Sequence, residues 1–322
     1  TGESPVEYPQ AEYYKEWHVL NGKLVFISSF NSVSLLLAIV ALAAGMYFDG
    51  LRLQRLVKIG GYKLSIQAVL RVIFSNYFMA MLTPGASGGA VAQVLVLKSY
   101  GVPISKGTPI VLIRTVFSIM FLVIMLPLVF LRDAIEIPYI SRDMLLLFAV
   151  LAVIATLLGT YILQTKYMRQ FVYNLAQRFK AHKTKDWLSK LETLNQGLGL
   201  LYKEPIQSSI VFIESGLSLL CLYCIAPALM YAFTPHIPII DILDRMILLN
   251  LILYFAPTPG GTGIAEGLFV VLFSAFVPNG TVGIVAVAWR VVAEYLPFFI
   301  GMYAVLTLYG RQFVAQETSR EQ

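Results

Sequence analysis

Two arginines, Arg114 and Arg290, lie well inside apolar stretches of the sequence. A charge at the centre of a membrane helix costs about 2.5–3.5 kcal/mol on insertion scales, so an arginine placed there normally has a partner. A guanidinium in such a place can bind a phosphate group. We therefore treat both as candidate ligands for an anionic headgroup. The alternative is that each side chain snorkels to a membrane surface.

A second pair of arginines, Arg71 and Arg245, lies upstream in similar sequence, and an asparagine follows each of them five residues later. For these two arginines, headgroup binding and snorkelling remain equally open. The asparagines, Asn76 and Asn250, are also candidate binding residues. Their amides can hydrogen-bond a ligand or a broken helix backbone, and we favour backbone repair.

A helix-breaking motif, T-P-G-x-[Ser/Thr]-G, follows each asparagine. Proline ends a helix and glycine permits a tight turn, and we expect Ser87 and Thr262 to cap the helices that follow. The N-terminus of such a helix presents unpaired N–H groups and a positive dipole end, which suits phosphate. The predicted binding residues are Thr83, Pro84, Gly85, Ser87 and Gly88 in the first motif and Thr258, Pro259, Gly260, Gly261, Thr262 and Gly263 in the second.

Three carboxylates, Glu214, Glu266 and Glu294, are placed inside the membrane by the hydrophobic pattern. Glu266 comes one helical turn after the second motif, where the first repeat has Val91. Glu294 follows Arg290 by four residues, so the two share a helix face. A structural ion pair and a proton-coupled site, in which protonation frees the arginine to bind phosphate, both remain open. We count Glu266 and Glu294 among the candidate binding residues.

The arginines, asparagines and motifs recur in the same order at a separation of about 175 residues, together with a Val-Pro dipeptide. A match of this length indicates internal duplication. In membrane proteins, repeats with broken helices point to a binding site at the interface between the repeats.

The composition indicates a membrane protein, with 58% hydrophobic and 13% charged residues and a mean hydropathy of +0.74. The net charge of +6 does not indicate nucleic-acid binding, because Lys and Arg gather in loops between apolar runs. The three histidines are scattered. Cys221 and Cys224 are interpreted as small residues on one helix face. We therefore expect no metal, no cofactor and no catalytic residue.

The hydrophobic runs predict an all-α polytopic membrane protein. Two runs, 66–100 and 239–279, are too long for one crossing of about 20 residues, and each contains a copy of the motif. We interpret each run as a re-entrant helical hairpin whose tip is surrounded by protein or water. The predicted parts are an interfacial segment at 1–23, a first repeat at 24–131, an outer loop and span at 132–163, a cytoplasmic basic amphipathic region at 164–208, the rest of the second repeat at 209–309 and a cytoplasmic tail at 310–322.

The basic residues also predict an orientation, because Lys and Arg favour the cytoplasmic side of a membrane. We place the four basic residues at 52–63 in a cytoplasmic loop, after a first span from Leu24 to Phe48. The start of the chain is then external and the C-terminus cytoplasmic, in a multi-pass protein of the cytoplasmic membrane. The two hairpins enter from opposite faces, which defines an inverted-topology repeat. We expect one further helix before Thr1, which would make the two halves equal.

The paired Pro-Gly-x-x-Gly breaks, Arg52, the turn from Gly101 to Ser105 and Arg114 resemble the flippase-like membrane domain of lysylphosphatidylglycerol synthases. The segment from Pro257 to Glu266 is similar to the most recognisable signature of that family. The resemblance covers most of the chain, without the family's first helix and without the soluble aminoacyl-transferase domain. It therefore implies movement of a lipid across the bilayer and does not imply lysine transfer. Some archaeal relatives are linked to dolichol-phosphate sugar pathways.

Three classes of function remain open. The first, which we prefer, is a flippase for a lipid with an anionic phosphate headgroup, of the phospholipid or polyprenyl-phosphate type, with the two hairpins as alternating gates. The second is a membrane enzyme of lipid glycosylation or headgroup transfer. The sequence has no Asp-x-Asp pair for it, and Asp241 and Asp244 are the nearest acidic candidates. The third is a non-transporting assembly subunit. The expected partners are the membrane and its lipid, and no nucleic acid.

Overall fold

The structure, a computed structural model, describes residues 31–132, 142–162, 204–278 and 280–318 and the single positions 192 and 199. The predicted interfacial segment at 1–23, most of the outer loop and most of the basic region at 164–208 lie outside the described residues. The described elements are α1 (Ser32–Ile59), α2 (Ile66–Leu82), α3 (Ser87–Ser99), α4 (Ile104–Leu131), α5 (Arg142–Ile162), α8 (Pro205–Tyr223), α9 (Ile225–Met230), α10 (Ile239–Leu253), α11 (Ile264–Phe273), the 3₁₀ turn η2 (Ser274–Phe276), α12 (Val282–Arg290), the π-helical turn η3 (Val291–Tyr295) and α13 (Leu296–Thr318).

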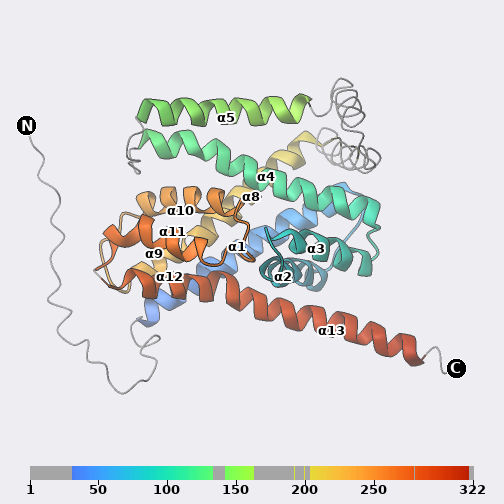
Figure 1. Ribbon diagram of the computed structural model, residues 1–322. Helices are drawn as coiled ribbons and strands as arrows, with labels where there is room; N and C mark the ends of the chain where they lie inside the picture. Colours follow the sequence, from blue (N-terminus) through green and yellow to red (C-terminus); the bar gives the residue numbers. More distant parts are fainter. Residues whose placement is uncertain are drawn as a thin grey trace, which may run out of the picture.

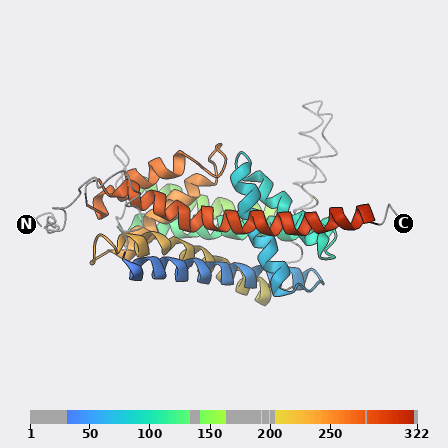
Figure 2. The ribbon, with the colours of Figure 1, turned by 90° about the horizontal axis from the view of Figure 1, so that it is seen from below.

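The regular elements of this part of the chain are all helices, and four continuous stretches are long and apolar enough to cross a bilayer. They are Ser32–Ile59, Ile104–Leu131, Pro205–Met230 and Val282–Leu308. The prediction of an all-α polytopic membrane protein is therefore confirmed. Helix α5 lies along the outside of α4, and α13 runs past the rest of the bundle towards the C-terminus (Figures 1 and 2).

Each run with a motif forms two short helices joined at the motif. Helices α2 and α3 have 17 and 13 residues, and α10 and α11 have 15 and 10. Each is shorter than the roughly 20 residues that a crossing requires. The helices of each pair pack against one another. These are the two broken hairpins that the sequence predicts, and Figure 1 shows α2 and α3 side by side.

The tips of the two hairpins meet. Pro84 and Pro259, the prolines of the two motifs, form an isolated antiparallel β-bridge, although 175 residues of chain separate them. The second tip also passes close to the end of α2, because a Cβ added at Gly260 would lie 3.4 Å from the Cα of Met81. The duplicated sequence therefore comes together at one place in the molecule.

The two tips share a left-handed backbone. Gly85 and Ala86 have φ of 60° and 53°, and Gly260 and Gly261 at the equivalent positions have φ of 58° and 68°. Ala86 is the one non-glycine residue with positive φ among the described residues. A left-handed conformation costs about 1–2 kcal/mol for a residue with a Cβ. The first tip therefore carries backbone strain that the second tip avoids.

The two halves of the chain interlock. Helix α4, which follows the first hairpin, packs on α10 of the second, and α13, which follows the second hairpin, packs on α2 of the first. The α13–α2 crossing is close, because a Cβ at Gly301 would collide with the carbonyl oxygen of Phe74 and lie 3.0 Å from the Cβ of Phe78. Small residues permit such approaches between membrane helices.

Two helices are longer than predicted. Helix α1 continues to Ile59, so Arg52, Arg55 and Lys58 are helical, and the prediction that they lie in a loop is wrong. The apolar residues between these charges continue the buried face of the helix, which the high local charge obscured in the sequence. Helix α13 continues to Thr318, into the predicted tail.

Candidate functional site

The first tip begins its second helix with a threonine cap. The hydroxyl of Thr83 accepts a hydrogen bond from the Gly88 N–H (2.8 Å) and donates one to the Met79 carbonyl (2.8 Å). Ser87 instead donates to the Pro84 carbonyl. The prediction that Ser87 caps α3 is therefore wrong. The capping hydroxyl belongs to the first residue of the motif, because the chain turns back before α3 begins.

The second tip is held by charged side chains. The Gly263 N–H donates to Glu266 Oε2 (2.6 Å), and Arg290 Nη2 donates to the Gly260 carbonyl (2.9 Å). Thr262 donates to the Pro259 carbonyl, so the prediction that it caps α11 is also wrong. A carboxylate therefore satisfies the N-terminus of α11, where a hydroxyl does so in the first tip.

A cavity of about 440 Å³ lies between the two tips and is also lined by residues of α1, α4, α8 and η3. Its polar lining comes from both halves of the chain. These lining residues are Asp49, Arg52, Asn76, Tyr77, Ser87, Gln93, Arg114, Thr115, Ser118, Ser218, Tyr223, Asn250, Tyr254, Thr258 and Glu294.

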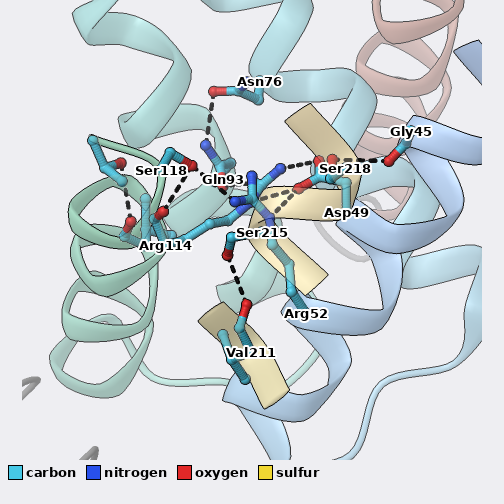
Figure 3. Close-up of polar contacts among 12 residues, drawn as sticks. Gly45, Asp49, Arg52, Asn76, Gln93, Arg114, Ser118, Val211, Ser215 and Ser218 are labelled. Carbon is cyan, nitrogen blue, oxygen red and sulfur yellow. Dashed lines mark hydrogen bonds and ion pairs between the residues drawn. The ribbon is translucent and has the colours of Figure 1, made fainter. Parts of the chain in front are cut away.

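Arg114 and Asp49 form the centre of the first charged cluster (Figure 3). Arg114 is 5% exposed and Asp49 is 4% exposed. Arg114 Nε donates to Asp49 Oδ1 at 3.1 Å, its Nη2 pairs with Asp49 Oδ2, and its Nη1 donates to the side-chain oxygen of Gln93. Gln93 in turn donates to Asn76 Oδ1 at 2.7 Å. The cluster therefore links α1, α4 and both helices of the first hairpin.

Arg52 adds a second guanidinium to this cluster. Its Nε donates to Asp49 Oδ1 and its Nη1 donates to Ser118 Oγ at 2.8 Å. Its Nη2 makes no hydrogen bond to another described residue. Two arginines thus share one carboxylate, Asp49, and the cluster carries one surplus positive charge. Such a surplus in a buried cavity suits an anion.

The second charged cluster has the opposite balance. Arg290 is 1% exposed, and its Nε donates to Glu266 Oε1 at 2.8 Å. Its Nη1 lies 3.0 Å from Glu294 Oε1. One guanidinium therefore lies between two carboxylates, and the cluster carries one surplus negative charge. The predicted Arg290–Glu294 pair is present, and Glu266 joins it from α11.

The structure brings many of the predicted site residues to the cavity and leaves others away from it. Arg71 donates to the Tyr100 hydroxyl at 2.7 Å, and the guanidinium of Arg245 lies 4.5 Å from the centre of the Phe276 ring. Neither arginine lines the cavity. The predicted residues that line it are Asn76, Gly85, Ser87, Arg114, Asn250, Thr258, Gly260, Gly261 and Glu294, and those that do not are Arg71, Thr83, Pro84, Gly88, Arg245, Pro259, Thr262, Gly263, Glu266 and Arg290.

The two asparagines have different contacts. Asn250 donates to the Met246 carbonyl in its own helix at 2.9 Å, which is the backbone role that the sequence favours. Asn76 accepts from the side chain of Gln93 and belongs to the first charged cluster. Gly89 lies against it, since a Cβ there would be 3.0 Å from the Asn76 carbonyl oxygen.

The sequence interpretation missed Asp49 and Arg52, which are central to the cavity. The sequence interpretation places Arg52 in a loop and gives Asp49 no role, because charged residues at the end of an apolar run resemble a membrane surface. One signal was present: Asp49 lies within an apolar-periodic stretch three residues before Arg52, a spacing that brings side chains together on a helix. Extending the helical period past Phe48 would have found both.

Two further ion pairs tie the helices together away from the cavity. Arg55 of α1 forms a bidentate pair with Glu214 of α8, with its Nη2 2.8 Å from Glu214 Oε1. Arg132 pairs with Asp244 at 3.4 Å. Glu214, which the sequence places in the membrane, is therefore structural. No group of three His, Cys, Asp or Glu residues in the described part could hold a metal ion.

Paired broken helices that meet at a buried, charged cavity define a class of polytopic membrane protein with its site at the repeat interface. The model of the lysylphosphatidylglycerol synthase transmembrane region matches residues 24–301, and the chain belongs to this family. The chain is also similar to a UPF0104 membrane protein of Archaeoglobus fulgidus, at 20% identity over 263 residues, which cover 79% of this chain and 80% of that protein.

Proposed function

We propose that the protein moves a lipid with an anionic phosphate headgroup across the membrane. The observation that supports this most strongly is the cavity between the two hairpin tips, in which two buried arginines share a single carboxylate. A phosphate oxygen in the cavity would accept a hydrogen bond from Arg52 Nη2, which makes none to another described residue. Phosphate contacts of this charge-assisted kind are about twice as strong as neutral hydrogen bonds.

The hairpins suit a gating role. Each is built from helices too short to span the bilayer, and each places its tip against the cavity. If they enter from opposite faces, as the basic residues predict, movement of one tip opens the cavity to one leaflet and movement of the other tip opens it to the opposite leaflet. The bridge between Pro84 and Pro259 joins the two tips, and the residues that follow each proline line the cavity.

Reconstitution into vesicles tests the proposal. Fluorescent phosphatidylglycerol placed in one leaflet should reach the other leaflet at a rate that scales with the amount of protein, and polyprenyl phosphate serves as a second substrate. Replacing Arg52 with Gln should slow this movement about tenfold or more, since a hydrogen bond to a charged group contributes about 1.5–3 kcal/mol. The fold should survive, because Asp49 keeps its bidentate pair with Arg114.

Arg132→Gln is the matched control. This arginine also pairs with an aspartate, but its side chain is 51% exposed and does not line the cavity. The control should transport lipid at the rate of the unmodified protein. If no anionic lipid moves, or if R52Q moves it at full rate, the proposal is wrong. A lipid-dependent glycosyl or headgroup-transfer product would favour the membrane-enzyme alternative.

A further inference from the structure

The second charged cluster has one carboxylate more than its arginine requires. Glu266 accepts from Arg290 Nε, and the Gly260 carbonyl accepts from its Nη2. These two contacts hold the guanidinium in place without Glu294. Glu294 can therefore gain or lose a proton while Arg290 keeps a carboxylate partner. Asp49 has no such freedom, because it is the one carboxylate that two arginines share.

Glu294 is also the carboxylate of this cluster that lines the cavity. Its side chain is 25% exposed and that of Arg290 is 1% exposed. The Glu266 side chain is 29% exposed but does not line the cavity. Glu294 belongs to the π-helical turn η3, and such turns are frequently found at functional sites. The carboxylate that lines the cavity is thus the one whose loss of charge leaves Arg290 with a second carboxylate partner, Glu266.

Two buried hydroxyls show that this cavity has unmet hydrogen-bonding capacity. Tyr223 is 3% exposed and lines the cavity, and its hydroxyl has no hydrogen-bond partner among the described residues. The hydroxyl of Thr258 is buried and unpartnered at the same cavity. Buried polar groups are normally satisfied by protein or by water. Water that enters the cavity to satisfy these hydroxyls would also reach Glu294 and carry protons to it, since all three residues line the same cavity.

The charged and titratable groups around Glu294 come from several elements. Arg290 of α12 pairs with it, Glu266 of α11 pairs with the same guanidinium, and Tyr77 of α2 lines the same cavity. Asp49 and Arg52 of α1 line the same cavity. The following helix, α13, begins with residues 296–302, which contain no ionisable side chain. The two clusters together hold three arginines and three carboxylates, so the site is neutral when every group is charged.

We propose, on the basis of the transport function above, that Glu294 binds a proton that travels with the lipid. Its carboxylate takes a proton from water on one side of the membrane and becomes a neutral carboxyl group. The site then carries one positive charge and binds a headgroup with one negative charge. The loaded site is neutral, and the proton leaves to water on the other side after the headgroup does. Transport is therefore electroneutral symport of one proton with one singly charged lipid.

Vesicles with a pH difference across the membrane test this coupling. Labelled phosphatidylglycerol should move preferentially from the leaflet facing the acidic solution to the leaflet facing the alkaline one. A membrane potential set with potassium and valinomycin should not drive it, and neither should a sodium gradient. Glu294→Gln should lose the response to pH while still equilibrating lipid between leaflets, and Glu294→Asp should restore part of it. The control is Glu204→Gln, an exposed carboxylate outside the cavity.

Proton uptake gives a second readout that a merely structural carboxylate would not change. Calorimetric titration of short-chain phosphatidylglycerol in buffers of different ionisation enthalpy should show about one proton taken up per lipid by the unmodified protein above the pH at which Glu294 ionises, and none by E294Q. Transport that ignores the pH gradient, or that follows sodium or the membrane potential, overturns the coupling and leaves the flippase function standing. Failure to transport any anionic lipid removes both.

Discussion

Arg114 and Arg290 occupy equivalent places in the two halves of the chain, but their carboxylates come from different elements. Asp49, on the helix before the first hairpin, neutralises Arg114 and also pairs with Arg52. In the second half, the carboxylates come from the hairpin itself and from the helix that carries the arginine. The residue four places after Arg114 is Ser118, whereas Glu294 occupies that place after Arg290.

This difference shows that two repeats can keep the same backbone conformation while their side chains carry opposite net charges. The backbone plan of the two tips is the same, including the left-handed pair of residues and the bridging prolines. The side-chain charges are reversed, with a surplus positive charge on one wall of the cavity and a surplus negative charge on the other. A duplicated fold therefore does not imply two identical sites. It provides two hairpin tips with the same backbone, and the charged residues around each tip can differ.

The largest expected effect comes from removing the shared carboxylate. Asp49→Asn leaves two arginines buried without an acidic partner, and breaking a buried pair in this way costs about 3–5 kcal/mol. Glu266→Gln should cost only about 1 kcal/mol, because Glu294 still pairs with Arg290 and the Glu266 side chain is 29% exposed. Unfolding in detergent micelles, followed by circular dichroism, measures both. If both variants lose the same free energy of unfolding, the two clusters depend on their carboxylates equally, and the proposed difference between them is wrong.

A smaller effect is expected from glycines in the second helix of each hairpin. Gly89→Ala would push a Cβ into the side chain and the carbonyl of Asn76, and overpacking of this kind costs about 1–3 kcal/mol. Gly267→Ala is the matched control, since nothing lies within 4 Å of the added carbon. Alanine is the better helix former by about 0.5–1 kcal/mol, so G267A should be slightly stabilising. Thermal unfolding of the two variants should shift in opposite directions.

The smallest effect distinguishes the first threonines of the two motifs. Thr83→Val removes a helix cap and should cost about 1 kcal/mol. Thr258→Val removes a hydroxyl that has no partner among the described residues, so it should be neutral or stabilising without lipid. If Thr258 contacts the headgroup, T258V should weaken lipid binding in a calorimetric titration while leaving the unfolding midpoint unchanged. A loss of stability from T258V in the absence of lipid would contradict this assignment.

Much of the helical plan follows from local sequence. The hairpins at 66–100 and 239–279 and their breaks agree closely with the observed helices, because proline and glycine end a helix wherever they occur. The sequence predicts too early an end for the first span, because Asp49, Arg52 and Arg55 resemble a membrane surface when they are considered one residue at a time. Their partners are far away along the chain: Arg114 and Ser118 on α4, and Glu214 on α8.

By itself, the sequence determined that this is an all-α polytopic membrane protein with two broken helices in a duplicated chain. It could do so because a bilayer requires each crossing segment to satisfy its own backbone hydrogen bonds, so the information is local. Only the tertiary structure decided which charged residues face the cavity, which of them share partners, and that the two prolines meet. These contacts depend on how the helices pack. Packing brings together residues that are far apart in the sequence, so no local sequence pattern predicts them.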